Sequence, residues 1–249
     1  MIGSEQYFGR KRMIKAAFMD IDDTLLDFQA FVRQTMRDGF ARFGLPAYEE
    51  RMYPVFHQVN ARLWERIERG EITRADLLDL RWPVIFDELG FTGDGRAFEH
   101  YFKDALLHSA IPVEGAEDLV PWLAERYILC AASNGPYAQQ ETRLTIAGWL
   151  PYFRHLFISE EIGAQKPTPA FFDTAMRRLN ASLMPGHSGP VLPGEVIMVG
   201  DSLTSDMAGG RNAGMVTCLL DTSGHAQPDD RVDHRISKLD ELKTLLGRI

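Results

Sequence analysis

An acidic cluster follows the first strongly apolar segment of this 249-residue chain. Asp20, Asp22, Asp23 and Asp27 fall within residues 20–27, which contain no Lys or Arg. Carboxylates this close together repel one another unless a cation or a proton neutralises them. A hard divalent cation such as Mg²⁺ takes carboxylate oxygens as ligands and leaves room for water and substrate phosphate. The alternative is a polar turn or a helix cap, because Asp is common in both.

Three further polar segments also follow apolar runs. Gly200-Asp201-Ser202 is followed by Asp206, about one helical turn further on. Ser133-Asn134-Gly135 offers a hydroxyl, an amide and a flexible backbone, which suit phosphate oxygens. Lys166 offers a positive charge. Each segment alone is also typical of a helix cap, a generic turn or a solvated surface charge.

Buried parallel strands are the elements that would position these residues. Five apolar runs predict strands, namely Ile14–Met19, Tyr127–Ala132, His155–Ser159, Glu195–Val199 and Met215–Leu220. Amphipathic stretches predict helices at Ala116–Glu125, Ala138–Ala147, Pro169–Leu179 and Ser202–Asn212. This alternation predicts an α/β fold with a doubly wound parallel sheet. Because all four polar segments follow a strand, we expect them to converge at the carboxyl edge of the sheet.

Residues 28–111 have a different pattern, with no convincing strand. Apolar residues recur there every three to four positions, as on one face of a helix. Thr73 and Asp76 resemble a capping box at a helix start. We therefore predict an all-helical domain at 28–111, inserted into a core domain made of 1–27 and 112–249. The aromatic residues assigned to packing inside this insert are Phe31, Phe56, Trp82 and Phe102.

Composition excludes several classes of partner. The 27 Lys and Arg against 35 Asp and Glu give a net charge of −8, which argues against polynucleotides and anionic membrane surfaces. Cys130 and Cys218 lie in apolar runs and are expected to be buried thiols in a reducing compartment. The first thirteen residues lack the apolar region of a secretory signal, and no apolar run is long enough for a membrane helix. We expect a cytoplasmic protein, with its oligomeric state undefined by the sequence.

The four polar segments together resemble a known family. Asp20-Ile21-Asp22-Asp23-Thr24, then Ser133, Lys166, and Gly200-Asp201 with Asp206, look like the four ordered motifs of the haloacid dehalogenase superfamily. The resemblance extends from about residue 15 to 221, and the helical insert is similar to the helical cap of that superfamily. It implies a Rossmann-like core and Mg²⁺-dependent chemistry on a small phosphorylated substrate.

The resemblance also implies a role for each motif residue. Asp20 is similar to the nucleophile, which would form an aspartyl-phosphate. Asp22 would protonate the leaving oxygen and then act as a base on water. True dehalogenases lack this acid, so its presence favours a phosphatase or phosphomutase. Mg²⁺ would be held by Asp20, the Asp22 backbone carbonyl and Asp201, with support from Asp206. The groups that would bind phosphoryl oxygens are Thr24, Ser133, Asn134 and Lys166.

Two segments resemble a subgroup, the bacterial 5′-nucleotidases that act on pyrimidine and non-canonical nucleoside monophosphates. They are residues 59–64 with 70–73 in the cap, and residues 156–167 in the core. Asn60 and Trp64 are four residues apart, so they share a helix face on which an amide and an indole would contact a base. Packing inside the cap is the alternative for both residues. Tyr137, just past the Ser133 segment, is a further candidate for the pocket wall.

The leading prediction is a hydrolase of nucleoside 5′-monophosphates such as dUMP, UMP and dTMP. A sugar-phosphate or phosphoglycolate phosphatase on the same core is the first alternative. A phosphomutase and a non-catalytic binding protein of the same fold are further alternatives, although the filled motif positions argue against the binding protein.

Overall fold

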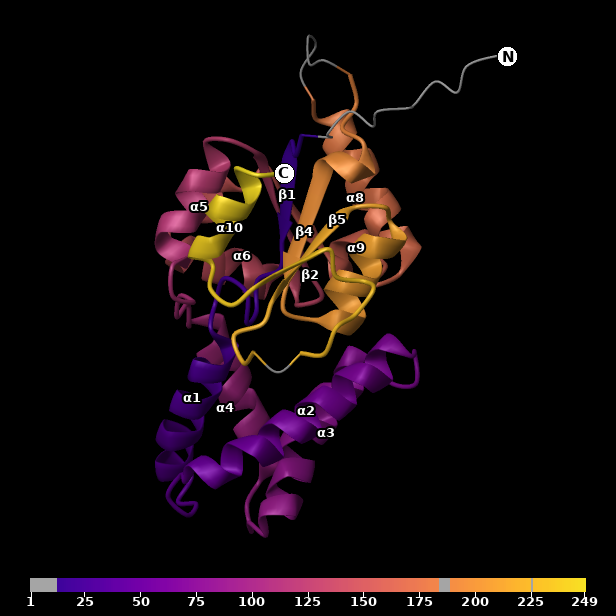
Figure 1. The fold of residues 1–249 in the computed structure, drawn as a ribbon. Coiled ribbons are helices and arrows are strands. Elements are labelled where there is room, and N and C mark those ends of the chain that lie inside the picture. The colour runs from indigo at the N-terminus through magenta and orange to yellow at the C-terminus, as the bar shows by residue number, and fades with distance from the viewer. Residues whose placement is uncertain (1–12, 184–188, 225) are drawn as a thin grey trace, which may run out of the picture.

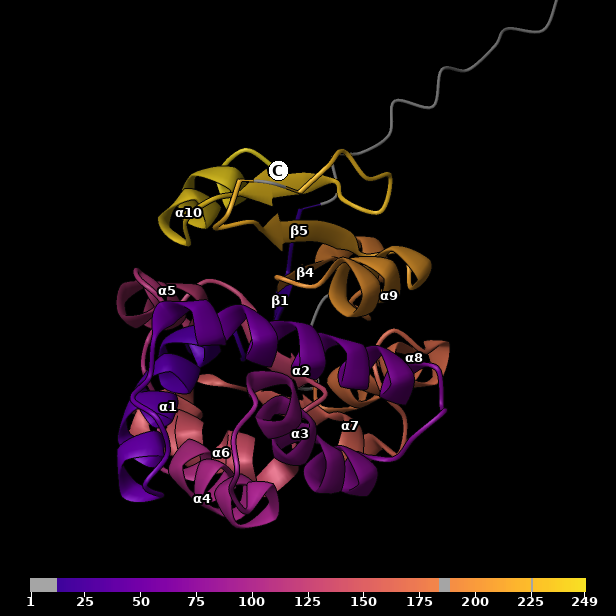
Figure 2. The same cartoon turned by 90° about the horizontal axis from the view of Figure 1, so that it is seen from below.

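The structure of the protein is a computed structural model that describes residues 13–183, 189–224 and 226–249. The chain forms a core domain around a β-sheet and a helical cap domain next to one end of that sheet (Figure 1). Viewed from the cap side, the cap helices lie across this end of the core (Figure 2). Of the core segment predicted as residues 1–27, the structure describes residues 13–27.

Six parallel strands form one sheet within the described residues, in the order β3-β2-β1-β4-β5-β6. They are β1 (Ala16–Met19), β2 (Ile128–Ser133), β3 (His155–Ile158), β4 (Val196–Gly200), β5 (Val216–Leu220) and β6 (His234–Ile236). Parallel strands covered on both faces are apolar along their length, and β1 and β4 are buried throughout. Five of these six strands were predicted from the sequence. The sixth, β6, was not predicted because it is short and carries the polar residues His234 and Arg235.

Helices cover both faces of the sheet, as Figure 1 shows. Ala17 and Met19 of β1 face the apolar layer of α5, α6 and α10, whereas Ala16 and Phe18 face that of α8. α9 packs beside α8. The core helices are α5 (Ala116–Ala124), α6 (Tyr137–Ile146), α7 (Ser159–Ile162), α8 (Pro169–Ala181), α9 (Ala208–Asn212) and α10 (Asp240–Leu246). The predicted α/β doubly wound class is therefore confirmed.

Some helices of the core differ from the sequence prediction. The helix predicted at Ser202–Asn212 starts with a π-helical turn at Leu203–Met207 and becomes α-helical only afterwards. The helices α7 and α10 were not predicted. Short 3₁₀ turns occupy Glu50–Met52, Leu150–Tyr152 and Pro193–Glu195.

The cap is a helical bundle with its own apolar core. Its helices are α1 (Phe28–Arg42), α2 (Tyr53–Glu68), α3 (Arg74–Leu89) and α4 (Gly95–Leu107). The expected capping box is present, because Thr73 accepts from the Asp76 backbone while Asp76 accepts from that of Thr73. The aromatic residues predicted to pack are buried at its centre, including Phe31, Phe56, Trp82 and Phe102.

The chain crosses between core and cap at two segments that lie side by side. Leu26 and Pro112 form an antiparallel bridge, and the Asp27 backbone N–H donates to the Ile111 carbonyl at 2.8 Å. Val113 likewise donates to the Leu25 carbonyl at 2.9 Å. The domain boundaries at 27/28 and 111/112 stay a prediction, which this pairing of the two segments supports.

Both cysteines, Cys130 and Cys218, are buried free thiols, and burial raises the pKa of each to about 12. A bilayer-spanning helix needs more length and hydrophobicity than any helix has in the described part of the chain.

Candidate active site

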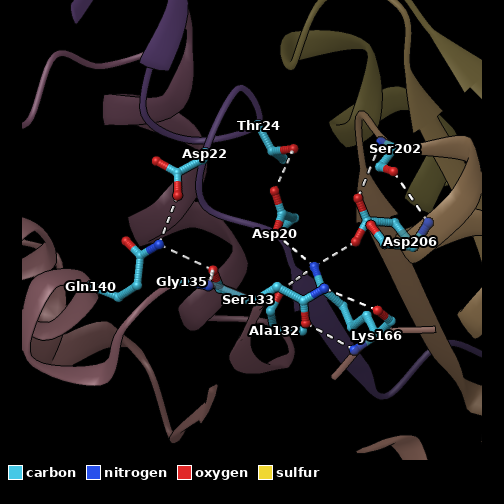
Figure 3. A network of polar contacts seen from close by, with 12 residues as sticks. Asp20, Asp22, Thr24, Ala132, Ser133, Gly135, Gln140, Lys166, Ser202 and Asp206 are labelled. Atoms are coloured by element: carbon cyan, nitrogen blue, oxygen red, sulfur yellow. Dashed lines mark hydrogen bonds and ion pairs between the residues drawn. The ribbon is translucent and has the colours of Figure 1, made fainter. Parts of the chain in front are cut away.

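The predicted polar segments meet at the carboxyl ends of adjacent strands. Asp20 follows β1, Ser133 ends β2 and Asp201 follows β4, while Lys166 comes from the loop after α7. Figure 3 shows side chains from these segments converging around the Lys166 ammonium group. The strand order places β1 between β2 and β4, so the topology itself brings these residues together.

Lys166 is the centre of the site. Its Nζ donates to Asp20 Oδ1 at 2.7 Å, to Asp206 Oδ1 at 2.6 Å and to the Ala132 carbonyl at 2.6 Å. The side chain is almost fully buried, which disfavours its charged form, but the carboxylates of Asp20 and Asp206 outweigh burial and raise the Lys166 pKa. Lys166 therefore stays an ammonium group and fixes the orientation of Asp20.

A third carboxylate, that of Asp201, lies near the two that contact Lys166. Asp20, Asp201 and Asp206 each offer an oxygen, and these oxygens lie within 4.8 Å of one another. Burial raises the pKa of Asp20, partly opposed by Lys166, and Asp206 raises it further. The excess negative charge and the all-oxygen donor set fit a hard divalent cation such as Mg²⁺. The side chain of Asp22 is not part of this cluster.

Gly200 provides the space for Asp206. The Asp206 carboxylate accepts from the Ser202 backbone N–H through Oδ2 at 3.2 Å, in addition to its contact with Lys166. A Cβ atom at position 200 would lie 2.1 Å from this Oδ2. Only glycine therefore permits the Asp206 carboxylate to reach the strand end.

The predicted phosphate-binding side chains have different surroundings. The Thr24 hydroxyl lies 3.5 Å from Asp20 Oδ2, and Ser133 Oγ accepts from the Gly135 backbone N–H at 3.1 Å. Asn134 instead brackets the backbone of Lys166, accepting from its N–H at 2.8 Å and donating to its carbonyl at 3.0 Å. Thr24 thus lies beside Asp20, Ser133 accepts within its own turn, and Asn134 holds the backbone of Lys166 in place.

Asp22 points toward α6 rather than into the carboxylate cluster (Figure 3). Its Oδ1 accepts from Arg143 Nη1 at 2.5 Å, and its Oδ2 accepts from Gln140 Nε2 at 2.7 Å. Neither partner was predicted from the sequence, because a polar residue within an amphipathic helix is usually solvated. The spacing of three residues between Gln140 and Arg143, which puts both on one face, was the available signal.

The two cap residues predicted to contact a base lie in the body of the cap. Asn60 Oδ1 accepts from Arg81 Nη1 at 3.2 Å, and Trp64 packs against the apolar core of the cap. Tyr137 lies in the core domain at the start of α6, where its backbone N–H donates to Glu160 at 2.7 Å. None of these three lines the cavity next to Asp201.

That cavity has a volume of about 520 Å³ and lies between cap and core. Tyr53 and His57 of α2 line it on the cap side, and Asp201 and Leu219 line it on the core side. Neither Tyr53 nor His57 was predicted from the sequence, and the motif chemistry itself needs no histidine. Their position at the N-terminal turns of α2 was not readable without the fold.

Another residue that the sequence did not predict, Arg74, joins the cap to the loops around the site. Its Nη2 donates to the Asn134 carbonyl at 2.7 Å and to Ser159 Oγ at 2.9 Å. Gln165 adds a contact in the other direction, donating to the Ile67 carbonyl at 3.0 Å. The cap therefore rests directly on the segments around Ser133 and Lys166.

Comparisons with known proteins agree with this geometry. A model of the haloacid dehalogenase-like hydrolases matches residues 14–214. The pyrimidine 5′-nucleotidase PynA of Streptococcus pneumoniae is 33% identical, over 94% of this chain and 98% of PynA. A glyceraldehyde 3-phosphate phosphatase of Methanothermobacter thermautotrophicus is 26% identical, over 94% of this chain and 100% of that protein.

A solved structure gives the same result. The crystal structure of the HAD-hydrolase YfnB from Bacillus subtilis, described as bound to magnesium, matches with a TM-score of 0.82 and 30% identity. The match covers 94% of this chain and 99% of that chain. The resemblance found in the sequence is confirmed, and the chain belongs to the haloacid dehalogenase-like hydrolase family.

Proposed function

We propose that the protein is a Mg²⁺-dependent phosphomonoesterase that works through an aspartyl-phosphate on Asp20. The observation that carries this proposal is the buried Lys166 ammonium between Asp20 and Asp206 at the carboxyl edge of the sheet. Phosphoryl transfer depends mainly on positioning and on neutralising negative charge. Lys166 does both for Asp20, and two of the relatives reported above are named for phosphate-ester hydrolysis.

The carboxylate cluster is where Mg²⁺ would bind. Asp20, Asp201 and Asp206 would hold it, with the backbone carbonyl of Asp22 as a further oxygen donor. When bound, Mg²⁺ supplies positive charge that offsets the charge on the phosphoryl oxygens. The magnesium described for the YfnB structure supports this assignment.

Asp20 and Asp22 would divide the reaction into two steps. A carboxylate oxygen of Asp20 forms a bond to phosphorus, the ester P–O bond breaks, and the leaving oxygen takes a proton from Asp22. Asp22 then takes a proton from a water molecule whose oxygen attacks phosphorus. The bond between phosphorus and Asp20 breaks, so inorganic phosphate leaves and both carboxyl groups return to their starting state. Lys166 keeps Asp20 aimed in both steps.

Nucleoside 5′-monophosphates are the substrate class that we propose. The cavity beside Asp201 has a volume within the range of small-molecule sites, about 300–1,000 Å³. Tyr53 and His57 give it one wall with two rings, on which a base would stack. The 33% identity to PynA supports the same class.

A sugar-phosphate phosphatase is the second candidate. Asp221, Thr222 and Ser223 give the cavity a polar stretch suited to hydroxyl groups. The relative named for glyceraldehyde 3-phosphate supports this candidate. No observation in the described part of the chain favours a phosphomutase or a non-catalytic protein.

A substrate panel with Mg²⁺ tests the proposal. We expect phosphate release from UMP, dUMP and dTMP with a kcat/KM at least about tenfold above that for glyceraldehyde 3-phosphate and phosphoglycolate. If the sugar phosphates are equal or better substrates, the nucleotidase assignment is wrong while the phosphatase assignment stands. If no ester releases phosphate with Mg²⁺, the phosphatase assignment is wrong as well.

A further inference from the structure

A buried arginine contacts Asp22, and the chemistry described above gives it no role. Arg143 of α6 has a side chain that is 1% exposed. Its Nη1 donates to Asp22 Oδ1 at 2.5 Å, and its Nε donates to the Ser109 carbonyl at 2.9 Å. Burying a guanidinium group costs free energy unless it is paired and hydrogen-bonded. Arg143 meets this requirement by using a carboxyl group of the active site.

Gln140, one turn earlier on α6, holds the other oxygen of the same carboxyl group. Its Nε2 donates to Asp22 Oδ2 at 2.7 Å and to Ser133 Oγ at 3.1 Å, while its Oε1 accepts from Arg143 at 3.2 Å. These contacts fix the amide orientation, since a flipped amide would turn its oxygen toward the carboxylate. A Cβ at position 135 would lie 2.2 Å from Gln140 Nε2, so Gly135 leaves room for this arrangement.

The contacts constrain Asp22 without enclosing it. Each carboxylate oxygen has two lone-pair directions, and Arg143 and Gln140 use one direction on each oxygen. The Asp22 side chain remains 32% exposed, so its other directions are open for proton transfer. The carboxyl group is therefore held in one orientation with a free side.

The same two residues connect Asp22 to other parts of the molecule. Ser109 lies just after α4, in the segment that leads from the cap back to the core. Ser133 ends β2 beside the predicted phosphate-binding loop. A change in either segment would reach the Asp22 carboxyl group through one side chain, Arg143 from Ser109 and Gln140 from Ser133.

We propose that Arg143 and Gln140 are positioning residues that aim the Asp22 carboxyl group at the leaving oxygen and tie its orientation to the cap linker at Ser109. The proposal rests on the proposed phosphomonoesterase function, in which Asp22 delivers a proton. Proton delivery matters most for a poor leaving group such as a nucleoside alkoxide. A good leaving group such as p-nitrophenolate departs with little help from an acid.

The test compares kcat/KM for UMP and p-nitrophenyl phosphate with Mg²⁺. Arg143→Met is expected to lower the value for UMP by about 10–100-fold and that for p-nitrophenyl phosphate by only a few-fold, since general acid catalysis contributes about 10²–10⁴-fold. Arg143→Lys, which keeps the charge, is expected to recover part of the UMP value. The ratio of kcat/KM for UMP to kcat/KM for p-nitrophenyl phosphate is the quantity compared. When Asp22 is already replaced in Asp22→Asn, adding Arg143→Met is expected to leave this ratio unchanged.

Two variants separate positioning from a merely structural role. Arg81→Met removes another buried arginine, which pairs with Glu99 in the cap, and is expected to leave the substrate ratio unchanged. Gln140→Leu tests the proposal without removing a charge, and is expected to shift the ratio in the same direction as Arg143→Met.

Equal losses on both substrates, or no loss, in Arg143→Met and Gln140→Leu would overturn the proposal. If Arg143→Met does not fold, the Gln140→Leu result decides alone. If the wild-type protein hydrolyses neither UMP nor p-nitrophenyl phosphate, the proposed function is overturned instead. Failure of the positioning proposal and failure of the proposed function are therefore distinguishable.

Discussion

The core and the cap both bury charged side chains, but with different balances of charge. In the core, the buried carboxylates of Asp20 and Asp206 both contact the ammonium group of Lys166, and the exposed Asp201 carboxylate lies within 4.8 Å of them. In the cap, Arg81 pairs one-to-one with Glu99 at 2.5 Å, and its guanidinium group lies over the ring of Phe102. A balanced buried pair needs nothing further, whereas an unbalanced cluster needs a cation. The difference separates a cluster that a divalent cation would complete from an ion pair that is complete by itself.

Asp20→Asn is the change expected to have the largest effect, because an amide cannot serve as the nucleophile. Phosphate release from UMP should fall by at least about 10³-fold while the circular dichroism spectrum is unchanged. Asp79→Asn, at an exposed carboxylate of the cap, is the matched control and should keep wild-type activity. Wild-type turnover in Asp20→Asn would exclude the covalent mechanism.

Removing the buried basic side chain from each domain tests whether the charge balance of the core differs in its consequences from that of the cap. Lys166→Met and Arg81→Met each leave buried carboxylates unpaired, so each should lower the free energy of unfolding by about 3–5 kcal/mol in urea titrations. Only Lys166→Met should also lose turnover, and only in Lys166→Met should Mg²⁺ restore part of the stability. Equal responses of both variants to Mg²⁺ would contradict the distinction between the two regions.

Mg²⁺ should stabilise the wild-type protein through the core cluster. A cation at about 100 times its Kd adds about 2.7 kcal/mol to the free energy of unfolding, visible as a rise in Tm. Asp201→Asn should abolish most of this rise, and a chelator should stop phosphate release from the wild-type protein. A Tm that does not respond to Mg²⁺ would contradict the proposed binding of Mg²⁺ at the carboxylate cluster.

The smallest effects are expected at the cap wall of the cavity. Tyr53→Ala should raise KM for UMP several-fold with little change in kcat, because Tyr53 lines the cavity and does not touch the reacting groups. Trp64→Ala and Asn60→Ala test the residues predicted from the sequence, whose side chains contact the body of the cap. A larger KM effect at Trp64 or Asn60 would restore that prediction.

The motif residues of the core could be predicted from the sequence because strand ends are readable. An apolar run followed by Asp20, Ser133 or Asp201 locates each residue at the edge of a parallel sheet, and the topology then brings them together. No knowledge of side-chain contacts was needed for this step. The fold class followed from the same alternation of strands and helices.

Contacts between segments distant in the sequence could not be predicted in this way. Arg143 is separated from Asp22 by 121 positions, and nothing in the periodicity of α6 distinguishes a buried arginine from a solvated one. In the cap, helical spacing correctly grouped the packing residues but could not tell which helix end faces the core. Tyr53 therefore lines the cavity, although Asn60 and Trp64 share an equally regular helix face.

The most direct test of the central claim is the intact mass of the enzyme, quenched in acid during turnover of UMP with Mg²⁺. An aspartyl-phosphate intermediate predicts an adduct with the mass of one phosphoryl group, mapped by peptide analysis to Asp20 and absent in Asp20→Asn. An adduct on another residue, or wild-type phosphate release with no adduct under single-turnover conditions at any time point, would contradict it.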